Sequence, residues 1–200
     1  MTVVVGLGWG WVPSAAPEAT LGCLMEPGSL TERLMASGRR FAVEMLQLGT
    51  GLAHRDEAAP IGVAPGGAIS VRHVALTLDD VAVVVARSYC RQDCPVWFPI
   101  LDRGGRSLGF TLFSGEVALT RGPLEFAEAE GGHPLFELAR TRAPGLARFP
   151  ARRCRFELRG APLVVCEVFL PALETQLATA QPHPACADAR AAAPPSRRSV

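Results

Sequence analysis

The sequence has almost no net charge and no long apolar run. Its 200 residues include 20 basic and 19 acidic side chains, which gives a net charge of +1 at pH 7. This balance provides no general attraction to nucleic acid or to an anionic membrane surface. An anionic ligand would therefore have to be held by particular arginines, and we expect no nucleic-acid partner.

No segment approaches the roughly 20 unbroken apolar residues that a membrane-spanning helix needs. The apolar start, residues 1–11, is interrupted by glycines and lacks the basic flank of a secretory signal. We therefore expect a cytoplasmic protein without stable membrane insertion. An apolar fraction of 48% and a charged fraction of 20% are typical of a globular domain.

The sequence also lacks the motifs of several enzyme classes. It contains no nucleophile elbow, no phosphate-binding glycine loop and no HExxH zinc motif. Its six cysteines are scattered, and Cys90 and Cys94 have no second cysteine pair or nearby histidine to complete a zinc site. We therefore expect reduced, half-buried thiols and no metal.

A stretch near the start of the sequence has the spacing of helices. Residues 15–38 carry apolar side chains at helical intervals, with a break at Pro27-Gly28. Ser29 and Glu32 form a capping-box pattern, which predicts that a second helix begins at the serine. Gly38 is a suitable end for that helix.

The rest of the chain alternates between strand-like segments and short helical turns. Strands are expected at Phe41–Gly49, Ile69–Leu78, Val81–Tyr89, Val117–Glu128, Cys154–Leu158 and Leu163–Leu170. Helical segments are expected at Val96–Leu101, Ser107–Phe113 and residues 133–142, and residues 53–67 are expected to form a loop. Asp79-Asp80 and Gly160-Ala161-Pro162 would turn two hairpins, which predicts an α+β fold with an antiparallel sheet.

The composition changes after Pro171, where Ala, Pro, Gln and Arg dominate. We therefore expect one domain over residues 1–171 and a poorly ordered tail over residues 172–200.

Three charged residues interrupt strands that are otherwise apolar. Glu167 alternates with Val165 and Phe169, so it faces either water or the core, where its pKa would rise unless a cation paired with it. Arg72 and Arg87 are single cations on the two strands of one hairpin. Each could reach solvent from an edge strand or pair with a surface carboxylate. Alternatively, the two arginines and the glutamate could form a pocket for an anionic ligand that carries a hydroxyl.

Five sequence blocks follow one another between residues 20 and 171. They are Gly28-Ser-Leu-Thr-Glu-Arg-Leu34, Val71-Arg-His-Val74 with Ala86-Arg-Ser88, Arg106-Ser-Leu-Gly-Phe-Thr-Leu-Phe113, Ala151-Arg-Arg-Cys154 and Leu163-Val-Val-Cys-Glu-Val-Phe-Leu-Pro171. Each block is weak alone, but their joint order and spacing resembles the bacterial chorismate–pyruvate lyase family. The resemblance implies a sheet of about six antiparallel strands, with helices covering a buried ligand cavity.

The resemblance also implies a function. It predicts a carbon–oxygen lyase that converts chorismate to 4-hydroxybenzoate and pyruvate and so supplies ubiquinone synthesis. Arg72 would bind the ring carboxylate together with the backbone amides near Leu30 and Leu108. Glu167 would face the 4-hydroxyl and assist proton loss, and Arg87 would handle the enolpyruvyl carboxylate or its path out of the site. Because aromatisation drives this reaction, no cofactor is implied, and a cavity inside one domain is compatible with a monomer.

Two alternatives remain open at this level. The same fold serves as the effector-binding domain of some bacterial transcription regulators, which bind a small molecule and catalyse nothing. Those proteins carry a DNA-binding winged helix in front, whereas this sequence has only some 20 residues before the first matching block. A binding homologue without activity is the other alternative.

Overall fold

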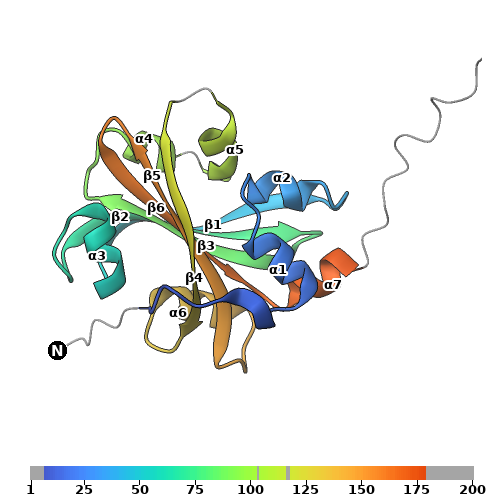
Figure 1. The fold of residues 1–200 in the computed structure, drawn as a ribbon. Coiled ribbons are helices and arrows are strands. Elements are labelled where there is room, and N and C mark those ends of the chain that lie inside the picture. Colours follow the sequence, from blue (N-terminus) through green and yellow to red (C-terminus); the bar gives the residue numbers. More distant parts are fainter. Residues whose placement is uncertain (1–6, 103, 116–117, 179–200) are drawn as a thin grey trace, which may run out of the picture.

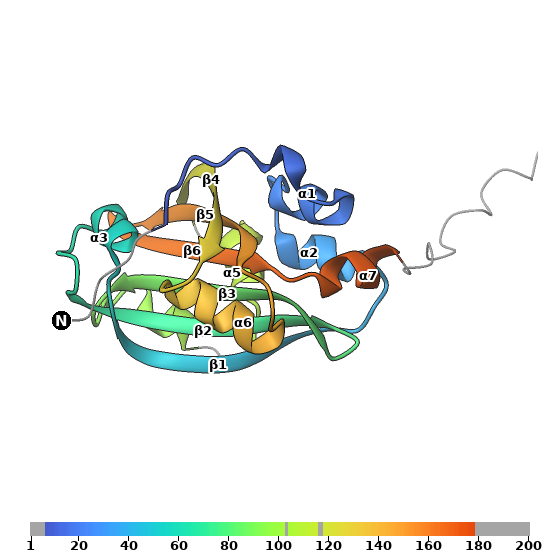
Figure 2. The ribbon, with the colours of Figure 1, turned by 90° about the horizontal axis from the view of Figure 1, so that it is seen from below.

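Six antiparallel strands form one sheet in the computed structural model, in the order β1-β2-β3-β6-β5-β4 (Figure 1, Figure 2). The strands are β1 Phe41–Leu52, β2 Ala68–Leu78, β3 Val81–Arg91, β4 Thr120–Glu130, β5 Arg148–Leu158 and β6 Ala161–Phe169. The structure describes residues 7–102, 104–115 and 118–178, so the predictions for residues 1–6 and 179–200 lie outside the described residues. The predicted α+β class and six-stranded antiparallel sheet are confirmed.

Two tight turns connect the hairpins at the centre of the sheet. Asp79-Asp80 joins β2 to β3 as predicted, with φ of 48° and 65°, the left-handed values that a type I′ turn requires. Aspartate tolerates this region because its short side chain can hydrogen-bond locally. The turn between β5 and β6 is Arg159-Gly160, with φ of 53° and 75°. It lies one residue earlier than the predicted Gly160-Ala161-Pro162 turn, so β6 already begins at Ala161.

Helices cover both faces of the sheet. They are the 3-10 turn η1 Pro13–Ala15 and the α-helices α1 Glu18–Leu24, α2 Leu30–Met35, α3 Arg55–Ile61, α4 Phe98–Leu101, α5 Leu108–Phe113, α6 Pro134–Arg142 and α7 Ala172–Ala178. The apolar residues of α3 and α6 pack in one core on one face, and α5 lies on the other side of the sheet from α6 (Figure 1). Among the described residues, no helix is long and apolar enough to cross a membrane.

The face opposite α6 carries two separate apolar clusters. One lies beneath α1, α2 and α7, and the other lies beneath α4 and α5. Side-chain caps fix the first turns of α2 and α5 at this face. Ser29 Oγ accepts a hydrogen bond from the amide of Glu32 at 3.3 Å, as the capping pattern predicted, and Ser107 Oγ accepts one from the amide of Gly109 at 3.1 Å. The two helices therefore start from fixed points above the gap between the clusters.

Two segments between the first strands differ from the predictions. Strand β1 continues to Leu52, through the break expected at Gly49–Gly51. A glycine is needed at position 51 for close packing between β1 and β2, because a Cβ at Gly51 would lie 2.9 Å from Cγ1 of Val71. Residues 53–67, expected to form a loop, contain α3, which begins with a reciprocal cap between His54 and Glu57.

The beginning of the predicted tail is helical. The seven residues of α7 follow Pro171 directly, and the side chain of Leu173 is fully buried. Glu174 accepts a hydrogen bond from the backbone amide of Thr20 at 2.6 Å, which joins α7 to the first turn of α1. Helix α7 therefore packs against the rest of the domain, although it follows residue 171, where the domain was expected to end.

Candidate functional site

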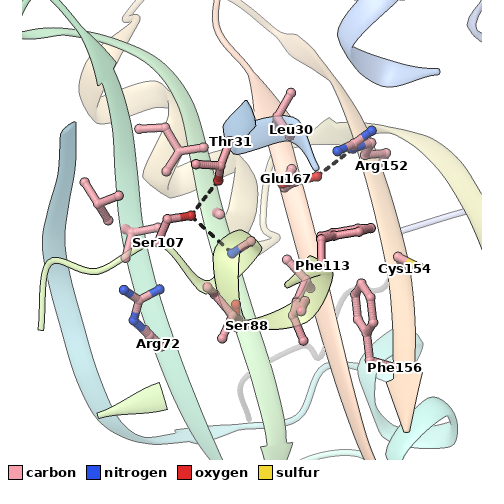
Figure 3. Close-up of a pocket in the computed structure, with 18 of the residues that line it drawn as sticks. Leu30, Thr31, Arg72, Ser88, Ser107, Phe113, Arg152, Cys154, Phe156 and Glu167 are labelled. Carbon is pink, nitrogen blue, oxygen red and sulfur yellow. Dashed lines mark hydrogen bonds and ion pairs between the residues drawn. The ribbon is translucent and has the colours of Figure 1, made fainter. Parts of the chain in front are cut away.

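A pocket opens on the face of the sheet that carries α2 and α5 (Figure 3). Its walls come from the two apolar clusters on this face, so it occupies the gap between them. The polar and charged side chains that line it are Thr31, Arg72, Ser88, Ser107, Arg121, Arg152 and Glu167. Apolar walls with a few converging polar groups are typical of sites for small ligands.

Cross-strand pairing brings the charged residues of the pocket together. Arg72 on β2 pairs with Ser88 on β3, and Glu167 on β6 pairs with Arg152 on β5. The other neighbour of Glu167 is Ala86 on β3, whose small side chain leaves space beside the carboxylate. Because opposite residues of an antiparallel pair share a face, these side chains all project toward α2 and α5.

Arg72 is a buried cation without a carboxylate partner among the described residues. It is 3% exposed, and its Nη2 donates hydrogen bonds to the carbonyl oxygens of Gly104 and Arg106 at 3.0 and 2.8 Å. Its Nε is buried and has no acceptor within the described residues. Burial lowers the pKa of this guanidinium, because its charged form loses solvation. A bound carboxylate would supply both the missing charge and the missing hydrogen bond.

Glu167 points into the same pocket and is oriented by Arg152. Nε of Arg152 donates to Oε2 of Glu167 at 2.5 Å, and the two side chains are 4% and 16% exposed. Oε1 of Glu167 has no hydrogen-bond partner within the described part of the chain, so it is the oxygen that a ligand can reach. The prediction that Glu167 shares a face with Val165 is confirmed, since both line the pocket.

Arg152 also fixes one wall of the pocket. Its Nη1 donates to the carbonyl oxygens of Cys23, Leu24 and Glu26 at 2.8, 3.2 and 2.9 Å. These carbonyls belong to the end of α1 and the turn after it, where backbone acceptors lack partners inside the helix. The turn leads into α2, whose first residue, Leu30, lines the pocket. A single guanidinium thus connects the pocket carboxylate to the α1–α2 segment.

The first turns of α2 and α5 meet beside the pocket. Thr31 Oγ1 and Ser107 Oγ share a hydrogen bond of 2.5 Å, visible in Figure 3. This approach requires Gly109, because a Cβ there would lie 2.6 Å from Thr31 Oγ1. Leu30 and Leu108, predicted as backbone donors, are the first residues of the two helices and both line the pocket. Amides in a first helical turn have no acceptor within the helix, so they can donate to a ligand.

Arg87 lies on the opposite face of the sheet, apart from Arg72 and Glu167. Its Nε and Nη2 donate to Oε1 and Oε2 of Glu57 on α3 at 2.6 and 2.9 Å. Its Nη1 lies 2.7 Å from Nε2 of His73. The charge of Arg87 is therefore balanced by a fully buried carboxylate, and the structure does not bring Arg87 into the pocket where the resemblance expected it.

A β-bulge decides the face on which Arg87 lies. The two-residue turn at Asp79-Asp80, continued as a regular hairpin, would pair Arg72 with Arg87 on one face. The register shifts by one residue between Leu76 and Thr77, so Arg72 pairs with Ser88 instead. A shift of one residue moves the following side chains of one strand to the other face.

Two pocket arginines, Arg121 on β4 and Arg152 on β5, are absent from the residues that the sequence predicted for the site. A signal for Arg152 existed, because a two-residue turn at Arg159-Gly160 pairs it with Glu167. The sequence pattern placed the turn one residue later, at Gly160-Ala161-Pro162, and so did not predict this pairing. No comparable local signal marks Arg121, whose orientation depends on an irregularity in β4. Within the described residues, no group of three or more His, Cys, Asp or Glu side chains could hold a metal ion.

Comparison with known sequences identifies related proteins. The sequence model of the family described as Chorismate lyase matches residues 12–179. The chain is 38% identical over 175 residues to the Probable chorismate pyruvate-lyase of Thiobacillus denitrificans, which covers 85% of this chain and 93% of the relative. It is 36% identical over 167 residues to the Probable chorismate pyruvate-lyase 1 of Burkholderia pseudomallei, with coverage of 82% and 90%.

Solved structures share the fold at lower sequence identity. The C-terminal domain of PhnF superimposes with a TM-score of 0.51 at 15% identity and covers 69% of this chain and 87% of that domain. PhnF from Mycobacterium smegmatis gives a TM-score of 0.51 at 19% identity, with coverage of 74% and 66%. At these identities the likeness shows the fold alone.

Proposed function

The chain belongs to the chorismate lyase family, and we propose that it eliminates pyruvate from chorismate to give 4-hydroxybenzoate. One observation carries the proposal: a single pocket holds Arg72, a cation without a carboxylate partner among the described residues, and Glu167, a carboxylate with one free oxygen. Chorismate offers a match for each group, because its ring carries a carboxylate at one end and a hydroxyl at the other.

Arg72 binds the ring carboxylate in this proposal. A guanidinium matches a carboxylate with two parallel hydrogen bonds, and the buried Nε of Arg72 is a donor without an acceptor. The backbone amides of Leu30 and Leu108 are further donors in the same wall of the pocket. The ligand carboxylate would therefore compensate a cation whose burial is otherwise unfavourable.

Glu167 acts at the opposite end of the ring. Its Oε1 accepts a hydrogen bond from the 4-hydroxyl, while Arg152 holds Oε2. This hydrogen bond orients the ring carbon that carries the hydroxyl, and the negative charge of Glu167 assists departure of the proton from that carbon. Arg152 is a positioning residue here, because its hydrogen bonds fix the carboxylate and the α1–α2 segment together.

The elimination is balanced within the substrate. The ether bond between the ring and the enolpyruvyl oxygen breaks, and its electron pair leaves with that oxygen. The proton on the neighbouring hydroxyl-bearing carbon is lost, and the electrons of that C–H bond complete the aromatic ring. Protonation of the enolpyruvate at its methylene carbon gives pyruvate. The protein contributes by holding the anionic groups in a reactive conformer and by surrounding the ring with apolar walls.

The family resemblance also suggests how the product is used and where the enzyme acts. We propose that 4-hydroxybenzoate supplies ubiquinone synthesis and that the enzyme acts in the cytoplasm. We also propose a monomer, because side chains of one chain are sufficient to line the pocket.

The test is to incubate the purified protein with chorismate and to quantify 4-hydroxybenzoate by chromatography and pyruvate by a coupled assay. We expect the two products in equal amounts. Glu167→Ala should lower kcat/KM. The decrease should correspond to a loss of about 2–4 kcal/mol of transition-state stabilisation. Glu137→Ala, which removes an exposed carboxylate from α6, is the matched control and should leave kcat/KM unchanged. Binding of chorismate without product would instead indicate a binding domain, and near-normal turnover in Glu167→Ala would refute its role.

A further inference from the structure

The charges that line the pocket do not balance. Three arginines and one glutamate line it, and Arg152 forms an ion pair with Glu167. Arg72 and Arg121 remain, and neither has a carboxylate partner among the described residues. A pocket with two uncompensated cations is suited to a ligand with two negative charges.

Arg121 is held in place by neutral groups. Its Nε donates to Sγ of Cys154 at 3.2 Å, and its Nη1 donates to the carbonyl oxygen of Pro27. Its Cζ lies 5.0 Å from the ring centroid of Phe113 and 5.9 Å from that of Phe156. No acceptor for Nη2 is found within the described residues. The guanidinium is thus oriented by aromatic and backbone contacts, while its charge remains available to a ligand.

A bulge in β4 turns Arg121 toward the pocket. Arg121 and Leu124 are three residues apart, so in a regular strand they would point to opposite faces. The register of β4 on β5 shifts between them, and Arg121 pairs with Phe156 while Leu124 pairs with Cys154. All four side chains line the pocket. Bulges that redirect one side chain are frequent beside ligand sites.

The order of strands separates the two uncompensated cations. Arg72 lies on β2 and Arg121 on β4, and β3, β6 and β5 lie between them. Glu167 on β6 therefore stands between the two arginines. A ligand that spans the pocket would meet Arg72 at one end, Glu167 in the middle and Arg121 beyond it.

We propose that Arg121 binds the enolpyruvyl carboxylate of the substrate and makes the site selective for a dianion. This inference rests on the proposed function, and it assigns to Arg121 the contact that the sequence resemblance expected of Arg87. The enolpyruvyl ether is attached to the ring carbon next to the hydroxyl, so its carboxylate lies on the Glu167 side of the ring. After elimination, 4-hydroxybenzoate retains only the carboxylate that faces Arg72. Arg121 therefore distinguishes substrate from product, whereas Arg72 binds both.

The test compares chorismate and 4-hydroxybenzoate in the variants Arg121→Gln and Arg121→Lys. Arg121→Gln should raise KM for chorismate roughly 10- to 100-fold, the effect of losing a hydrogen bond between charged groups. Its Kd for 4-hydroxybenzoate, measured by calorimetry, should change less than about threefold, because that ligand lacks the second carboxylate. Arg121→Lys should recover part of the loss, since lysine keeps the charge without the planar fork. Arg148→Gln removes a 62% exposed arginine from the same half of the sheet and should alter neither value.

Each outcome separates the inference from the proposed function. A wild-type protein that releases no pyruvate refutes the function, and calorimetric binding of chorismate to wild type and Arg121→Gln then still tests the second carboxylate contact. Pyruvate release with an unchanged KM in Arg121→Gln overturns the inference alone. An equal loss of affinity for chorismate and 4-hydroxybenzoate also overturns it, because it would show that the whole pocket is disturbed.

Discussion

Arg72 and Arg87 lie on neighbouring strands of one hairpin and are equally buried, with 3% of each residue exposed. Their hydrogen-bond partners differ in charge. Within the described residues, the hydrogen bonds of the Arg72 side chain go only to carbonyl oxygens, and the side chain lines the pocket. Arg87 forms two hydrogen bonds with the buried carboxylate of Glu57 and contacts His73. Burial alone therefore does not separate a cation that lacks a carboxylate partner from one that has it.

The balance of charge is the reason why we propose Arg72, and not Arg87, as the arginine that binds the ligand. A buried ion pair whose partners satisfy each other has no net charge to offer a ligand, and removing one partner alone is strongly destabilising. A buried cation without a counterion is unfavourable for the free protein and becomes favourable when an anion binds. The two faces of the sheet thus differ in charge balance. The uncompensated cation, which we propose binds a ligand, lies on the side of α2 and α5, and the compensated one lies beneath α3.

The largest expected effect is on stability. Arg87→Met should lower the free energy of unfolding by about 3–5 kcal/mol, because it leaves the Glu57 carboxylate buried and unpaired. Urea unfolding followed by circular dichroism measures this loss. The double variant Glu57→Met with Arg87→Met should recover most of the stability, since no buried charge is left alone. A double variant as unstable as the single one would show that the ion pair is not the cause.

Arg72→Met should have the complementary effect on catalysis. We expect kcat/KM for chorismate to fall, because the proposed charged contact to the ring carboxylate is lost. The decrease should correspond to about 2–4 kcal/mol of transition-state stabilisation. The free energy of unfolding should change by no more than about 1 kcal/mol, since no buried carboxylate loses its partner. Steady-state kinetics give kcat/KM, and urea unfolding of the same sample gives the free energy of unfolding. A loss of stability as large as that of Arg87→Met would remove the contrast between the two arginines.

The smallest expected effect is the pH dependence of stability that His73 causes on the face of the sheet with Arg87. Burial, and then the charge of Arg87, lowers the pKa of His73 to about 4. The unfolded chain takes up this proton near pH 6.5, whereas the folded protein takes it up only near pH 4. Stability due to His73 is therefore complete above pH 6.5 and is lost as the pH falls toward 4, by up to about 3 kcal/mol.

His73→Gln checks this dependence. We expect the variant to show a flatter decline of the free energy of unfolding between pH 7 and pH 4.5 than the wild type. Catalytic selectivity between chorismate and 4-hydroxybenzoate should stay the same, because His73 lies on the face opposite the pocket. Identical slopes for the two proteins would show that His73 does not contribute the pH dependence.

Much of the fold follows from local patterns in the sequence. The Asp79-Asp80 turn, the helix start at Ser29 and the alternation around Glu167 are all found as predicted, because each depends on residues close together in the chain. The segment that contains α3 was expected to be a loop. Its helix is stabilised by packing against the sheet and by the Glu57–Arg87 ion pair, which involve residues distant in the sequence.

By itself, the sequence determined the antiparallel α+β architecture and the presence of Arg72 and Glu167 as charges embedded in apolar strands. Only the tertiary structure decided which other arginines join them. A bulge in the β2–β3 hairpin turns Arg87 away from the pocket, and a bulge in β4 turns Arg121 into it. The physical reason is the two-residue period of a strand. A register shift of one residue inverts the face of a side chain, and such a shift is set by the packing of whole strands, which local sequence does not reveal.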